Sequence, residues 1–122
     1  MQHRSERGAV LVTGGAGFLG QRVVRTLLQQ GERPVVFDRN RHTGAAPFCQ
    51  GDVLDRVALE QALGRYAVRR IIHLAAALPP ETEADPAGSA KLNVIGTRNV
   101  FEAAVVAGIE RVLYSSSIAV YG

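Results

Sequence analysis

The residues best suited to chemistry in this chain are a glycine cluster at positions 10–20. The cluster reads Val-Leu-Val-Thr-Gly-Gly-Ala-Gly-Phe-Leu-Gly, so an apolar strand runs directly into glycines and then into an apolar helix start. Gly14 allows a tight turn, Gly17 lets backbone amides approach a pyrophosphate, and Gly20 lets the helix pack close to the strand. The helix N-terminus stabilises the phosphates there. Gly15 completes G-x-G-x-x-G, weak evidence alone but stronger in this strand-to-helix context, and the cluster predicts a dinucleotide-binding site.

Two acidic residues follow predicted strands and can contact the adenosine half of such a ligand. Asp38 can accept hydrogen bonds from the ribose hydroxyls, and its charge repels a 2′-phosphate, which favours NAD over NADP. Arg39 and Arg41 follow it and can stack on adenine or pair with a 2′-phosphate, so NADP remains the less favoured alternative. Asp52 either accepts from the adenine amine or simply closes a turn, and the sequence leaves both interpretations open.

Further polar and small residues are predicted at the same edge of the sheet. His73 lies within an apolar run, so we interpret it as a structural histidine and not as a base. The alanines at 75–77 would let a flat cofactor lie against the strand end. Asn93 and Gly96 are poor helix formers, which suggests a side-chain hydrogen bond and close packing, or else an exposed turn of a tolerant helix. The serines at 115–117 place hydroxyls at the ligand edge or merely cap the strand.

Alternating strands and helices must position these residues. Strands are predicted at residues 9–13, 34–38, 47–50, 70–74 and 111–114 or 115, and helices at 18–30, from Asp55 onward, and at 86–107. Asp55 and Asp85 are predicted as N-caps, with Pro86 in the first turn of the last helix and Gly108 at its end. The alternation predicts an α/β fold, a Rossmann-type doubly wound parallel sheet of order 3-2-1-4-5 that ends after the fifth strand. Its ligand should lie over the carboxyl ends of the first and fourth strands.

Two further expectations concern the first helix and the longest loop. The first helix should bury one face, consisting of Leu19, Val23, Val24, Leu27 and Leu28. The proline-rich loop at 78–86 is either a simple surface connection or a flap near the ligand, and we hold these alternatives equal.

Composition limits the class of protein. The chain has 122 residues, 47% hydrophobic and 20% charged, which fits one dinucleotide-binding domain spanning 1–122. No apolar run reaches the length of a membrane span, so we expect a cytoplasmic protein. Cys49 is the only cysteine, which excludes an internal disulfide, and we expect an inert thiol and no metal. The net charge is +3, but the arginines are scattered without aromatic interleaving, so nucleic acid is not an expected partner.

Five motifs together resemble the extended short-chain dehydrogenase/reductase family, and within it the NAD-dependent epimerase/dehydratase group that acts on nucleotide sugars. They are the segments at 13–20, 51–53 (Gly-Asp-Val), 73–76 (His-Leu-Ala-Ala), 93–97 (Asn-Val-Ile-Gly-Thr) and 115–122 (Ser-Ser-Ser-Ile-Ala-Val-Tyr-Gly). The resemblance spans nearly the whole chain, in the expected order.

The resemblance implies a role for each matching residue. The pyrophosphate region would contact Gly14, Gly17, Phe18 and Leu19; the ribose would contact Asp38, with Arg39 beside it; the adenine would contact Asp52 and Val53; and the rest of the cofactor would be lined by Leu74, Ala75, Ala76 and Ser115. Asn93 would hold a structural or proton-relay position. Ser117 would match the catalytic serine that hydrogen-bonds the reacting sugar oxygen.

One family feature is missing from these residues. The family uses a Tyr-x-x-x-Lys pair, in which the tyrosinate takes a proton while hydride passes to the nicotinamide. The tyrosines here are Tyr66, Tyr114 and Tyr121, and the only lysine is Lys91, so no such pair occurs. We therefore expect the N-terminal cofactor-binding portion of a longer protein, inactive alone. The alternative is a non-catalytic NAD(P)-binding module or redox sensor.

The expected partners follow from the same resemblance. They are the dinucleotide and, in the longer parent protein, a nucleotide sugar or another hydroxylated small molecule. A homodimer is a further expectation from the family, whose members dimerise through the long helix, here at 86–107, and through the helix that follows the catalytic tyrosine, which these residues do not include. No membrane partner is expected.

Overall fold

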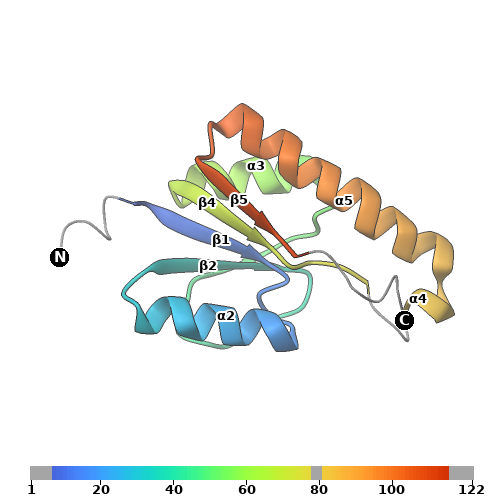
Figure 1. Ribbon diagram of the computed structural model, residues 1–122, viewed down its shortest axis with the longest axis horizontal. Coiled ribbons are helices and arrows are strands. Elements are labelled where there is room, and N and C mark those ends of the chain that lie inside the picture. The colour runs from blue at the N-terminus through green and yellow to red at the C-terminus, as the bar shows by residue number, and fades with distance from the viewer. Residues whose placement is uncertain (1–6, 78–80, 116–122) are drawn as a thin grey trace.

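The computed structural model describes residues 7–77 and 81–115, and within them five parallel strands form one sheet (Figure 1). The strands are β1 (Ala9–Thr13), β2 (Arg33–Asp38), β3 (Phe48–Gln50), β4 (Val68–His73) and β5 (Arg111–Tyr114). Their order in the sheet is β3-β2-β1-β4-β5, which confirms the predicted Rossmann-type topology. Thr13 at the end of β1 lies level with Phe37 of β2 and His73 of β4, and Tyr114 of β5 lies level with His73.

Helices cover both faces of this sheet (Figure 1). Helix α2 (Phe18–Gln29) lies on one face, and α3 (Arg56–Arg65) and α5 (Pro86–Ala107) lie on the other. The side chains of β1 alternate between the two layers, since Leu11 belongs to the core under α3 and α5 while Val12 belongs to the core under α2. Every residue of β1 is buried, as expected for a central parallel strand covered on both faces.

Residue types at the helix ends account for most of the helix boundaries. The Asp55 carboxylate accepts a hydrogen bond from the amide of Ala58 at 3.1 Å and starts α3. Asp85 does the same at the start of α5, where Pro86 occupies the first turn, and Gly108 ends α5 with a φ of +69°. These capping residues were predicted from the sequence, and the structure confirms them.

Apart from element ends that differ by one residue, the structure differs from the sequence prediction at three places. Strand β4 begins at Val68 and ends at His73, two residues earlier than predicted at its start. A short helix, α4 (Glu81–Ala84), lies within the segment predicted as a loop, while residues 78–80 lie outside the described residues. In α2, Leu19 and Leu28 are 53% and 40% exposed, so the predicted buried face is too wide. The helix packs on the sheet through a narrower set, Val23, Val24 and Leu27.

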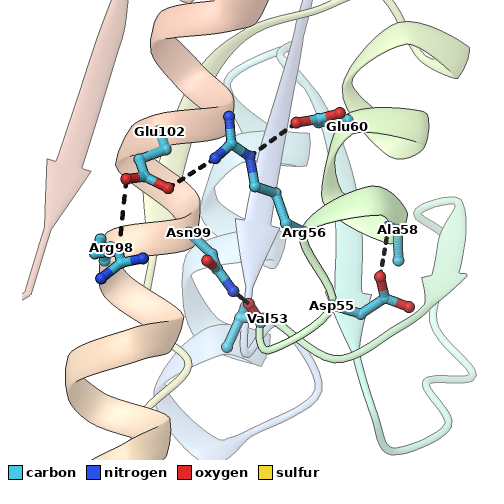
Figure 2. A network of polar contacts seen from close by, with 8 residues as sticks. All are labelled: Val53, Asp55, Arg56, Ala58, Glu60, Arg98, Asn99 and Glu102. Atoms are coloured by element: carbon cyan, nitrogen blue, oxygen red, sulfur yellow. Dashed lines mark hydrogen bonds and ion pairs between the residues drawn. The ribbon is translucent and has the colours of Figure 1, made fainter.

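A polar network joins α3 to α5 (Figure 2). The guanidinium of Arg56 contacts Glu60 at 2.9 Å and Glu102 of α5 at 2.7 Å, and Glu102 also pairs with Arg98 at 3.5 Å. Because these side chains are partly exposed, the pairs contribute little to stability individually. Of the three pairs, Arg56–Glu102 is the one that connects α3 to α5.

Other expectations concern a membrane, metals and the cysteine. No helix in the described part of the chain is long and apolar enough to span a membrane. Among residues 7–77 and 81–115, no group of three or more His, Cys, Asp or Glu residues could hold a metal ion. Cys49 in β3 is half-buried, and burial raises the pKa of its thiol more than nearby Arg65 lowers it. The raised pKa is consistent with the inert thiol predicted from the sequence.

Candidate dinucleotide-binding site

A cleft of about 620 Å³ lies at the carboxyl ends of the strands. Most of the predicted site residues line it, namely Gly14, Gly17, Phe18, Leu19, Asp38, Arg39, Asp52, Val53, Leu74, Ala75, Ala76 and Ser115. The lining also includes five residues that sequence reasoning did not select, namely Phe37, Asn40, Glu81, Leu92 and Tyr114. Gly51 and His73 line it too, and both belong to motifs noted in the sequence, although neither was expected to contact the ligand. Ser117 lies outside the described residues. The topology therefore brings four separate sequence motifs to one concave surface.

The glycine loop between β1 and α2 forms the inner wall of the cleft. Gly14 has a φ of +70°, and a Cβ there would lie 2.8 Å from the amide nitrogen of Ala75 on the neighbouring strand end. A Cβ at Gly20 would overlap the carbonyl oxygen of Gly14. Both positions therefore require glycine because the backbone itself occupies the space of a side chain. The first turn of α2 is consequently held directly against the end of β1.

The N-terminus of α2 opens into this cleft. Helix α2 begins at Phe18 with Gly17 as its N-cap, and within the described residues no side chain caps it and no acidic residue occupies its first turn. Phe18 and Leu19, which line the cleft, are 81% and 53% exposed, so they stand at its mouth. Free amides at the positive end of a helix dipole form a site for a phosphate group.

Asp38 connects the glycine loop to the turn that follows β2. Its Oδ2 accepts a hydrogen bond from the amide of Ala16 at 3.0 Å, and its Oδ1 accepts one from the amide of Asn40 at 2.8 Å. An ionised carboxylate offers about four acceptor positions. Asp38 can therefore hold the loop in place and still accept hydrogen bonds from ligand hydroxyls in the cleft that it lines.

One wall of the cleft is formed where the chain leaves β3. The Oδ1 of Asp52 accepts a hydrogen bond from the amide of Leu54 at 2.9 Å, so the turn interpretation of Asp52 holds while the residue also lines the cleft. A Cβ at Gly51 would lie 2.6 Å from the ring of Phe37. This contact explains why a glycine precedes Asp52 and how Phe37 comes to form part of the wall.

Helix α5 supports this wall from behind. A Cβ at Gly96 would lie 2.7 Å from Cγ2 of Val53, so the glycine permits the close packing that the sequence suggested. The buried amide of Asn99 donates a hydrogen bond to the carbonyl oxygen of Val53 at 3.0 Å (Figure 2). Sequence reasoning missed Asn99, although its position one turn after Gly96 places both on one helix face.

Asn93 lies on the same helix but does not line the cleft. Its Oδ1 accepts from the amide of Ala77 at 2.8 Å, and its Nδ2 donates to the carbonyl oxygen of Ala77 at 3.3 Å. The predicted side-chain hydrogen bond is thus present. It fixes the path of the chain directly after the cleft residues Leu74, Ala75 and Ala76, at Ala77, which is buried and is not part of the cleft lining.

His73 lies in the floor of the cleft and is 1% exposed. Burial lowers the pKa of its imidazole from 6.5 to about 4. The ring is therefore neutral at pH 7, and it lies between the hydroxyl groups of Thr13 and Thr97. This environment agrees with the sequence interpretation of a structural histidine.

Comparisons with known proteins agree with this geometry. The family model described as "NAD dependent epimerase/dehydratase family" matches residues 10–122. A UDP-glucose 4-epimerase of Rhizobium meliloti (strain 1021) is 39% identical over 120 residues, which cover 93% of this chain and 36% of that protein. The chain thus spans about a third of the length of the curated relatives that it matches.

Solved structures of similar fold also include enzymes described as epimerases and dehydrogenases. The crystal structure of UDP-glucose 4-epimerase from Brucella ovis in complex with NAD matches with a TM-score of 0.85 and 37% identity, over 94% of this chain and 37% of that one. The GalE-like L-threonine dehydrogenase from Cupriavidus necator matches with a TM-score of 0.85 and 28% identity, over 91% of this chain and 37% of that one. On the family match, the sequence identity and the shared fold, the chain belongs to the NAD dependent epimerase/dehydratase family.

Proposed function

We propose that this chain binds NAD in the cleft at the carboxyl ends of β1 and β4, as the cofactor-binding part of a nucleotide-sugar oxidoreductase. The observation that carries the proposal is the fit between the glycine loop and a pyrophosphate. Gly14 and Gly20 are positions where backbone fills the space of a Cβ, and they bring an uncapped helix N-terminus to the cleft. Backbone amides can then surround two phosphates without a lysine.

The remaining residues would orient the two ends of the dinucleotide. Asp38 would accept hydrogen bonds from the adenosine ribose, and its charge favours NAD over NADP. Asp52 and Val53 would contact the adenine, with the backbone of Val53 fixed by Asn99. Leu74 and the two alanines that follow it line the cleft, and the small alanine side chains would let the nicotinamide half lie against the end of β4.

The substrate proposed for the whole protein is a UDP-sugar. The residues of this chain would bind and orient NAD, which would supply the hydride acceptor for oxidation of a sugar carbinol. Ser117 is proposed to hydrogen-bond the reacting sugar oxygen. The two structural relatives have equal TM-scores, so the fold does not discriminate between sugar and amino-acid substrates. Sequence identity favours the epimerase, at 37% against 28%.

Fluorescence titration of the purified protein with NADH and NADPH tests the binding proposal. We expect saturable binding of NADH that is tighter than that of NADPH, and we expect Asp38→Ala to reduce this preference. Asp85→Ala is the matched control, because it also removes a carboxylate that accepts a hydrogen bond from a backbone amide, but Asp85 does not line the cleft. The absence of saturable binding by either dinucleotide would refute the cofactor assignment. Tighter binding of NADPH would refute the role given to Asp38.

Substrate assays with the whole protein test the proposed activity. Interconversion of UDP-galactose and UDP-glucose should be observed, and oxidation of L-threonine should not. The opposite result would reject the nucleotide sugar while leaving the NAD site in place.

A further inference from the structure

Three hydroxyl-bearing or aromatic side chains surround His73, each from a different element. The Nδ1 of His73 lies 2.6 Å from Oγ1 of Thr13 on β1, and its Nε2 lies 3.1 Å from Oγ1 of Thr97 on α5. The ring of Tyr114 on β5 stacks on the imidazole with centroids 5.7 Å apart and an interplanar angle of 18°. His73 therefore connects β1, β4, β5 and α5 directly beneath the cleft.

The donors around Thr13 determine which imidazole nitrogen carries the proton. Oγ1 of Thr13 accepts a hydrogen bond from the amide of Ala75 at 3.2 Å. It also accepts a hydrogen bond from the amide of Leu74 at 3.0 Å. The same Leu74 amide donates to the carbonyl oxygen of Thr13 as well. A hydroxyl has two acceptor positions and one proton, so the proton of Thr13 is directed to Nδ1 of His73. His73 then carries its own proton on Nε2 and donates it to Thr97.

From this hydrogen-bond pattern we infer that His73 is a positioning residue for the cofactor. It holds Leu74 and Ala75 in the cleft floor through the hydroxyl of Thr13, and the hydroxyl of Thr97 fixes the proton on its Nε2. The inference rests on the proposed NAD function, since it assigns a role to the floor of that same site. Ala75 is also the residue that a Cβ at Gly14 would touch. A shift of these amides would therefore alter the spacing between the β4 end and the glycine loop.

The surroundings of the ring favour this one protonation state. A proton on Nδ1 would face the Thr13 hydroxyl, whose acceptor positions already receive two amides, so that hydroxyl could accept it only by giving up one of them. The described neighbours of the ring on β1, β5 and α5 supply two hydroxyls and one phenol ring, and none of them is a carboxylate that would stabilise an imidazolium. Burial lowers the pKa of His73 to about 4, in agreement with that reading.

The first test needs no variant. Long-range ¹H–¹⁵N NMR of the imidazole at pH 7 should show a protonated Nε2 and an unprotonated Nδ1 in His73. A proton on Nδ1, or a charged ring at that pH, would overturn the inference. Amide hydrogen exchange of Leu74 and Ala75 should be slow in the same sample, and rapid exchange of both would also overturn it.

Variants then connect the floor to cofactor binding. His73→Phe keeps a planar ring against Tyr114 but removes both hydrogen bonds, and we expect NADH to bind about tenfold more weakly, with faster exchange at Leu74 and Ala75. Thr13→Ser keeps the hydroxyl and should bind NADH nearly as well as the wild type, whereas Thr13→Val should resemble His73→Phe. Thr97→Val removes only the outer bond and should give a smaller loss.

These experiments separate the inference from the function on which it rests. If wild-type protein shows no saturable NADH binding, the proposed function fails. If wild-type protein binds NADH and folded His73→Phe binds it equally, with unchanged exchange at Leu74 and Ala75, the positioning role fails and the function stands. If His73→Phe does not fold, the imidazole NMR and the comparison of Thr13→Ser with Thr13→Val decide the question.

Discussion

The free energy of unfolding should decrease as the pH falls from about 6.5 to about 4, and His73 should cause most of this decrease. Burial lowers the pKa of His73 from 6.5 to about 4 in the folded protein. Between these two values the unfolded chain binds a proton that the folded protein excludes, so the free energy of unfolding rises with pH through this window. The contribution is complete above the unfolded pKa and is lost once the pH reaches the folded pKa.

The magnitude follows from the size of the pKa shift. A difference of about 2.5 pH units corresponds to about 3 kcal/mol, with a limiting slope of about 1.4 kcal/mol per pH unit. A second group acts in a lower window. The hydrogen bond from Arg70, with a smaller one from Arg7, lowers the pKa of Glu32 from 4.5. The stabilisation from Glu32 is therefore present above about pH 4.5 and is lost only below it.

Urea unfolding followed by circular dichroism, in steps of about one unit from about pH 7.5 to about 4.5, measures this dependence. Wild-type protein and Glu32→Gln should both lose stability across the window, since Glu32 titrates below it. His73→Phe should be less stable at pH 7.5 but should show a much flatter dependence. A flat wild-type profile, or an unchanged slope in His73→Phe, would refute the reasoning that links burial of this ring to stability.

Three further outcomes are expected. Gly20→Ala should destabilise the protein by about 1–3 kcal/mol in urea unfolding and weaken NADH binding, because its Cβ would overlap backbone. Gly64→Ala, whose Cβ meets nothing within 4 Å, should stabilise the protein by up to about 1 kcal/mol in the same measurement. Equal effects of the two would contradict the packing argument. Asn99→Leu should cost about 1–3 kcal/mol by leaving a buried carbonyl oxygen without its donor, and an unchanged unfolding midpoint would be evidence against this. A double-mutant cycle between Arg56 and Glu102, whose side chains are 39% and 41% exposed, should give a coupling free energy of less than about 1 kcal/mol that decreases as salt is added. A larger coupling that does not respond to salt would mean that the pair is desolvated.

The elements were predictable because short-range signals coincide with their ends. Asp55 and Asp85 carry carboxylates that reach an amide three residues later, and Gly108 adopts the positive φ that ends a helix. The glycine loop was predictable for the same reason, since Gly14 adopts a positive φ and a Cβ at Gly20 would overlap the carbonyl oxygen of Gly14 within the same loop. Such requirements involve residues only a few positions apart, so they can be recognised in a single sequence.

The interactions behind the cleft were not predictable because they join residues distant in sequence. Nothing local to Asn99 indicates that it meets a carbonyl oxygen 46 residues earlier. His73 could be interpreted as structural from its apolar neighbours, but its two threonine partners depend on strand register and on where α5 crosses the sheet. Helical periodicity likewise placed Leu19 and Leu28 on the buried face, although the packed stripe of α2 is narrower.

The position of the cleft floor has a consequence for the order of events during synthesis. The Thr13 hydroxyl meets an imidazole 60 residues later in the chain, and the end of β1 becomes complete only when β4 has paired beside it. Chains emerge from the ribosome with the N-terminus first. The nascent glycine loop, β2 and β3 therefore emerge while the loop still lacks one wall, and the nascent chain should gain affinity for the dinucleotide only after His73 has left the ribosomal tunnel.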